Sequence, residues 1–164
     1  MSRALFIVDA SVLIELCAVD RAVLRLISKH VGQLHVSAPM LADEVPALTA
    51  EDCRDLGIAV VEPDLDLLLR AAVRRPGLSF HDHLCLLLAK ARTWICLTND
   101  GRLRRECKAV GVTCQWGLDP VVELVTGGHL DRGHAKRLIV ALKVRSPRHY
   151  TDAIVARFLA EVGG

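Results

Sequence analysis

Short strand-like runs alternate along the chain with longer segments in which apolar residues recur every three or four positions. The runs lie at 5–8, 34–37, 58–61 and 94–97, with a weaker one at 113–115, and their length predicts strands. The segments between them, at about 11–30, 39–48, 64–74, 80–91 and 101–110, have the spacing of helices. This alternation predicts an α/β fold with three layers, in which helices cover both faces of a mainly parallel sheet of four to five strands.

The strand signal ends at Pro120, and three helical patterns follow it. They cover 120–125, 130–142 and 151–162, separated by the breaker segments 126–128 (Thr-Gly-Gly) and 145–147 (Arg-Ser-Pro). A tail of about 40 residues is too short for a core of its own. We therefore expect an α/β body over residues 1–126 and a helical extension of the same domain over residues 127–164.

Composition favours one globular domain outside a membrane. The 164 residues are 52% apolar, which supports one sizeable core. No apolar run approaches the roughly 18 residues of a membrane span, and the run before Asp9 is too short for a signal peptide. We expect a cytoplasmic protein. The six cysteines form no Cys-x-x-Cys pair, so we expect reduced thiols in the core.

Four acidic residues stand where this fold would gather them. Asp9 and Asp100 each follow a predicted strand, Asp82 opens a helix that is apolar on nearly every side, and Glu44 lies in the 39–48 helix. Functional groups of parallel α/β folds collect at the carboxyl ends of the strands. Clustered carboxylates repel one another unless a proton or cation intervenes, and a hard divalent ion prefers oxygen ligands. The pattern predicts a metal site.

Helix capping is the alternative for three of these acids. Asp9 and Asp100 precede helices, and Ser79-x-x-Asp82 matches a capping box. The combination of all four still favours a site. Ser11, two residues after Asp9, and Thr98, two before Asp100, supply hydroxyls that would orient the carboxylates.

The segments around these acids resemble the four signature blocks of PIN domains, in the order of that family. The blocks are 7–14 (Ile-Val-Asp-Ala-Ser-Val-Leu-Ile), 39–45 with Asp-Glu-Val at its end, 78–90 (Leu-Ser-Phe-His-Asp-His-Leu-Cys-Leu-Leu-Leu-Ala-Lys) and 97–103 (Leu-Thr-Asn-Asp-Gly-Arg-Leu). The resemblance covers about residues 3–125. The tail resembles the extension of a subgroup that has two additional C-terminal helices.

PIN domains are metal-dependent ribonucleases, and many are VapC-type toxins of toxin–antitoxin pairs. The resemblance implies that Asp9, Glu44, Asp82 and Asp100 are catalytic and bind Mg²⁺ or Mn²⁺. It implies hydrolysis of RNA phosphodiester bonds that leaves a 5′-phosphate and a 3′-hydroxyl. It also implies an antitoxin protein as partner. The assembly would be a homodimer, or a hetero-oligomer with that antitoxin. The chain departs from the family pattern after Asp100, because no further acid follows until Glu106, where members of the family often have an additional one. The number of bound metal ions therefore stays open.

Basic residues follow Asp100 directly. Arg102, Arg104 and Arg105 are predicted to bind RNA phosphates, which would position the substrate without reading its sequence. The alternative is a solvated helix face on which Arg102 pairs with Glu106 one turn away.

Two other functions stay open at this point. A catalytically silent PIN-like protein-binding module would have the same fold without metal-dependent cleavage. A phosphatase with Asp9 as phosphoacceptor would resemble the haloacid dehalogenases, but those have an acid where this chain has Ser11.

Overall fold

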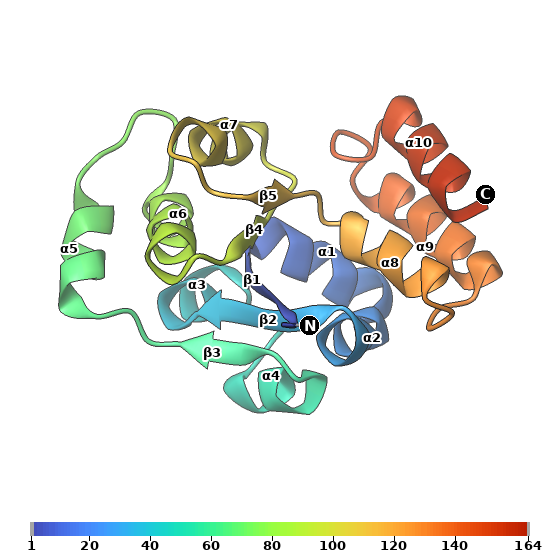
Figure 1. The fold of residues 1–164 in the computed structure, drawn as a ribbon, viewed down its shortest axis with the longest axis horizontal. Helices are drawn as coiled ribbons and strands as arrows, with labels where there is room; N and C mark the ends of the chain where they lie inside the picture. The colour runs from blue at the N-terminus through green and yellow to red at the C-terminus, as the bar shows by residue number, and fades with distance from the viewer. Residues whose placement is uncertain (1, 164) are drawn as a thin grey trace.

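Five parallel strands form the centre of the molecule. The computed structural model describes residues 2–163. The strands are β1 (Ala4–Val8), β2 (Gly32–Ser37), β3 (Ala59–Val61), β4 (Ile95–Leu97) and β5 (Cys114–Gln115), in the spatial order β3-β2-β1-β4-β5 (Figure 1). All four strand pairs are parallel, and the predicted α/β fold class is confirmed.

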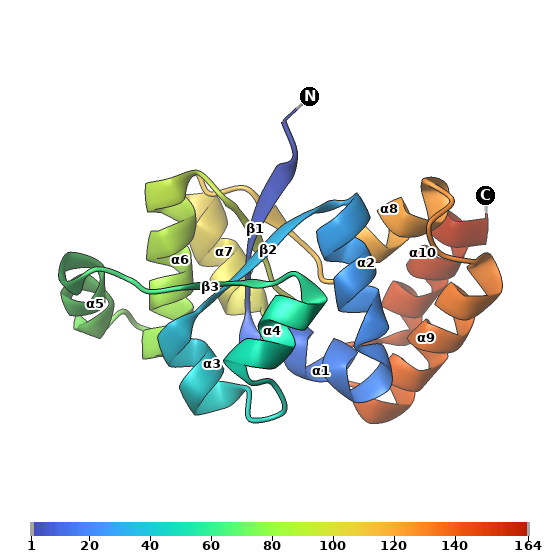
Figure 2. The same cartoon turned by 90° about the horizontal axis from the view of Figure 1, so that it is seen from below.

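Helices cover both faces of this sheet. Those of the body are α1 (Ala10–Asp20), α2 (Ala22–His30), α3 (Ala38–Glu44), α4 (Ala50–Leu56), α5 (Leu65–Ala72), α6 (Phe80–Arg92) and α7 (Gly101–Ala109). Figure 2 shows α6 and α7 on one side of β1 and the pair α1 and α2 on the other. Among the described helices, none has the length and apolar character needed to cross a membrane.

The observed helices differ from the expected ones at three places in the first part of the chain. The single helix predicted over 11–30 is two helices that meet at Arg21. Helix α4 was not expected, although Thr49 and Asp52 form a capping box at its start. Helix α3 ends at Glu44, well short of the predicted residue 48, because a proline disfavours helical backbone in the residue before it and Pro46 follows closely.

The core extends over both faces of the central strand, and helix α6 supplies much of it on one side. Phe6 and Ile7 of β1 are fully buried, and Leu84 to Ala89 form an unbroken buried stretch of α6. A helix buried along its middle exposes only its ends, here the first turn, with Asp82, and the last turn, with Lys90 and Arg92.

The C-terminal helices pack against the α1–α2 side of the body. They are α8 (Asp119–Thr126), α9 (Arg132–Arg145) and α10 (Asp152–Gly163), and α9 contacts α1 while α8 contacts α2. The imidazole Nε2 of His134 on α9 lies 2.6 Å from a carboxylate oxygen of Asp20 at the end of α1. The segment between α9 and α10 lies beside α1 and the loop after β4, because Tyr150 hydrogen-bonds to Glu15 and Asn99.

Candidate active site

The pairing of β1 with β4 places Asp9 beside the loop that contains Asp100. Val8 is the register partner of Leu97, and the Asp9 amide donates to the Leu97 carbonyl at 3.0 Å. The residues that follow the two strands are therefore adjacent at one edge of the sheet. Thr98 is fully buried there, and its hydroxyl accepts a hydrogen bond from the Asp100 amide at 3.0 Å.

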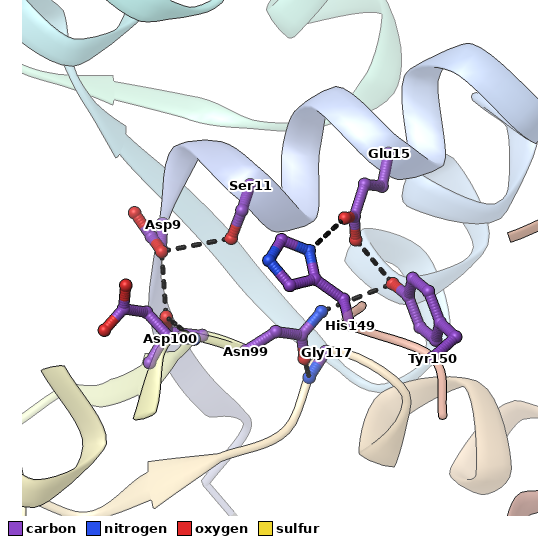
Figure 3. Close-up of polar contacts among 9 residues, drawn as sticks. Asp9, Ser11, Glu15, Asn99, Asp100, Gly117, His149 and Tyr150 are labelled. Atoms are coloured by element: carbon purple, nitrogen blue, oxygen red, sulfur yellow. Dashed lines mark hydrogen bonds and ion pairs between the residues drawn. The ribbon is translucent and has the colours of Figure 1, made fainter. Parts of the chain in front are cut away.

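Asp9 is buried, and all its close polar partners are neutral. One carboxylate oxygen accepts from the Ala10 amide at 2.8 Å. The other accepts from the hydroxyls of Thr98 at 2.8 Å and Ser11 at 3.1 Å (Figure 3). Burial, followed by the negative charge of Asp82, raises the pKa of Asp9 to about 6 against these hydrogen bonds. The orienting roles expected of Ser11 and Thr98 match these contacts.

Asp82 and Asp100 cap helices and also line the cleft beside Asp9. Asp100 accepts through one oxygen from two amides of the first turn of α7, those of Arg102 at 2.8 Å and Leu103 at 2.9 Å. Asp82 forms the expected capping box with Ser79. Each uses a single oxygen for these contacts, so capping and participation in a site are compatible.

An open cleft of about 310 Å³ brings the four predicted acids together. Its lining residues are Asp9, Ala10, Ser11, Ile14, Glu44, Ser79, Asp82, Asp100 and His149. Glu44 reaches it as the last residue of α3. The neighbouring Asp43 has another partner, because its carboxylate lies 3.0 Å from Nε2 of His81. The position of Glu44 therefore distinguishes it from the adjacent acid.

His149 was not among the predicted site residues. It enters the cleft from the segment between α9 and α10, and its Nδ1 lies 2.6 Å from a carboxylate oxygen of Glu15. Glu15 itself is buried in α1. Figure 3 shows the second ring nitrogen of His149 turned toward the side where Asp9 and Ser11 lie. His149 and Glu15 are 134 residues apart in the sequence, so no local pattern could have indicated this pair.

Tyr150 fixes the same segment to the body. Its buried hydroxyl donates to Glu15 at 2.6 Å and accepts from the side-chain amide of Asn99 at 3.3 Å. Asn99 in turn accepts from the Gly117 amide at 2.9 Å (Figure 3). Burial and the adjoining Glu15 raise the pKa of Tyr150 well above its ordinary value, so the phenol remains a donor. These bonds connect the extension with the residue that precedes Asp100.

The three predicted RNA-binding arginines do not line the acidic cleft. Arg104 and Arg105 line a separate opening on α7, and Arg102 is exposed. The guanidinium of Arg104 lies 3.7 Å from the centre of the Trp116 ring and donates to the Thr98 carbonyl at 3.4 Å. The expected alternative pairing of Arg102 is also absent from the described contacts, because Glu106 accepts from Arg75 at 2.6 Å.

The donors of the cleft suit a hard divalent cation. Four carboxylates supply only oxygen atoms, the ligand type that Mg²⁺ and Mn²⁺ prefer. The described hydrogen-bond partners of the Asp9 carboxylate are all neutral, and burial raises its pKa. The fold and this cleft together define a parallel α/β protein with an acidic site at the carboxyl ends of its strands. Neither protein-family models nor curated proteins give a match to this chain.

Proposed function

We propose that this protein is a divalent-metal-dependent endoribonuclease with its active site in the acidic cleft. The observation that carries the proposal is the convergence of Asp9, Glu44, Asp82 and Asp100 in one cleft at the end of the sheet. Helix capping alone explains each aspartate locally but gives no reason for Glu44 to face the other three. The resemblance of the surrounding segments to PIN domains supports RNA as the substrate.

In this proposal, Asp9, Asp82 and Asp100 hold Mg²⁺ or Mn²⁺, and Glu44 ligates it directly or through water. Such an ion lowers the pKa of a bound water and neutralises charge on the phosphodiester that is attacked. Ser11 and Thr98 fix the rotamer of Asp9, because both hydroxyls donate to the same oxygen. The carboxylates of Asp82 and Asp100 are oriented by backbone amides at the helix starts, which donate to one oxygen of each.

His149 would act on the substrate from the opposite side of the cleft. Glu15 accepts from its Nδ1, which leaves the second nitrogen available to an RNA phosphate or to a bound water. The contact with Glu15 holds the ring at the cleft, where a substrate phosphate would lie. The C-terminal extension would thus contribute directly to substrate binding.

The toxin role is a narrower part of the same proposal. It rests on the resemblance to VapC-type toxins and carries with it an antitoxin protein as partner. A short neighbouring reading frame for a small DNA-binding protein, together with a stable complex of the two products, would support it.

The adjacent acids Glu44 and Asp43 give a matched test. Cleavage of a single-stranded RNA is measured with pure protein in Mg²⁺ or Mn²⁺, with and without chelator. Glu44→Gln should reduce the rate by more than the about 10–100-fold lost when a metal ligand loses its supporting hydrogen bond. Asp43→Asn should retain the rate. If wild-type protein shows no cleavage that the chelator abolishes, or if both variants lose the same share of the cleavage rate, the proposal is refuted. A silent binding module would then be favoured.

A further inference from the structure

Three cysteines converge behind the loop that contains Asp100. Cys96 lies in β4, Cys107 in the last turn of α7 and Cys114 in β5, and their sulfur atoms all lie within 4.8 Å of one another. The local backbone explains the convergence. Cys96 and Cys114 are register partners in the sheet, and the Val112 amide donates to the Cys107 carbonyl at 2.8 Å. Sequence spacings of 11 and 7 residues hide this cluster from a search for zinc-like pairs.

The cluster has the dimensions of a thiolate metal site. A zinc–sulfur bond is about 2.3 Å, so three sulfurs around one ion stand about 3.8–4.0 Å apart. The observed sulfurs need to approach by less than about 1 Å to reach this spacing. Thiolates select soft cations such as Zn²⁺ and Cu⁺ over Mg²⁺, so the cluster would not compete for the ion of the acidic cleft.

A guanidinium and a further thiol lie next to the cluster. The Arg104 guanidinium lies 3.5 Å from the sulfur of Cys114. A fourth thiol, that of Cys85, lies 3.8 Å from the sulfur of Cys96 and is placed to hydrogen-bond to it.

An opening to solvent reaches Cys114. The surface cleft there has a volume of about 340 Å³ and is lined by Arg104, Arg105, Lys108, Val112 and Cys114. Cys96 and Cys107 are fully buried, whereas Cys114 is half-buried at the mouth. Cys114 is therefore the member of the cluster that solvent reaches.

We propose that Cys96, Cys107 and Cys114 form a binding site for one thiophilic d¹⁰ cation, with Zn²⁺ as its representative. Bound there, the ion would tie α7 to β4 and β5. Because Asp100 caps the other end of α7, the same ion would help to hold that carboxylate in place. This site is independent of the proposed nuclease function and would exist in a catalytically silent chain as well.

The test uses the full chain, reduced and stripped of metal, with Zn²⁺ alone or Cd²⁺ alone. After desalting, wild-type protein should retain about one equivalent per chain. The Cd²⁺ form should show the ultraviolet charge-transfer band of a cadmium–thiolate bond. Cys114→Ser should lose more affinity than the about 10–100-fold that follows loss of a ligand's hydrogen-bond partner. Cys17→Ser, which alters a partly buried thiol outside the cluster, should bind as wild type does.

A second measurement requires no variant. Bound Cd²⁺ should protect Cys114 from alkylation, as read by peptide mass, while Cys17 remains equally reactive with and without the ion. Wild-type protein that retains no more Zn²⁺ than Cys114→Ser would overturn the proposal. Zinc uptake that is lost in Asp9→Asn and kept in Cys114→Ser would overturn it as well, because the ion would then belong to the acidic cleft.

Discussion

Replacing Asp9 by Asn should stabilise the metal-free protein, and only above a defined pH. The carboxylate is 5% exposed and its pKa is raised from 3.8 to about 6 by burial and by the charge of Asp82. At about 1.36 kcal/mol per pKa unit, an ionised Asp9 costs the folded state about 3 kcal/mol relative to the unfolded chain. The isosteric amide removes this charge.

The pH dependence of this stability difference follows from the direction of the pKa shift of Asp9. Below the unfolded value of 3.8, Asp9 is protonated in both states and imposes no penalty. As the pH rises from 3.8 through about 6, the unfolded chain ionises more readily than the folded one, so the free energy of unfolding falls. Above about pH 6 this loss is constant. The Asn side chain must reverse its hydrogen bond to Thr98, which costs about 1 kcal/mol. The net gain of Asp9→Asn should therefore be about 2 kcal/mol above pH 7 and vanish or reverse near pH 4.

Urea unfolding with chelator present, at several pH values between 4 and 8, measures this difference. Asp66→Asn is the control, because Asp66 is an exposed acid of α5 with a single surface partner, Arg70. Its difference from wild type should not vary with pH. If Asp9→Asn is equally or less stable than wild type at pH 8, the argument that Asp9 is a strained, uncompensated carboxylate is wrong.

Three further predictions concern the cleft, the arginines and the extension. Mg²⁺ or Mn²⁺ should raise the thermal midpoint of wild type, because binding to the folded state alone stabilises it, and should raise that of Asp9→Asn much less; an equal rise in both would remove Asp9 from the site. Joint replacement of Arg102 and Arg105 by Gln should flatten the salt dependence of RNA binding by about one slope unit for each phosphate that is no longer neutralised, whereas a solvated or protein-docking face would leave the slope unchanged. Tyr150→Phe should lower the free energy of unfolding by about 1–3 kcal/mol in urea titrations, because buried Glu15 loses a donor, and an unchanged value would show that this bond is not needed.

Most of the sheet could be predicted because β1, β3 and β4 lie in apolar runs, while β2 alternates buried and partly buried positions. Runs of this kind are typical of strands covered on both faces, and all five were located correctly. Helix α4 was missed because its seven residues contain too few apolar positions for a periodic signal. Its capping box at Thr49 was present in the sequence and would have indicated its start.

The acids of the site could be predicted because each lies next to an element end or on a short helix. The sheet topology then converts chain position into spatial proximity. Glu15 and His149 could not be found in this way, because a contact across 134 residues depends on how the extension packs. The cysteine cluster was hidden for the same reason. Its members belong to three elements whose register, not their spacing, brings the sulfurs together.

The central claim is that the acidic cleft performs metal-dependent cleavage, and Asn substitution at Asp82 and Asp100 tests it most directly. Asn caps helices about as well as Asp at position 100, and at position 82 its amide oxygen can still accept from the Ser79 amide, so both variants should fold with stability near that of wild type. A neutral amide is a poor ligand for a hard cation. We expect cleavage of single-stranded RNA in Mg²⁺ or Mn²⁺ to be nearly abolished in each folded variant. Cleavage at the wild-type rate in both would contradict the account and leave these two aspartates as helix caps alone.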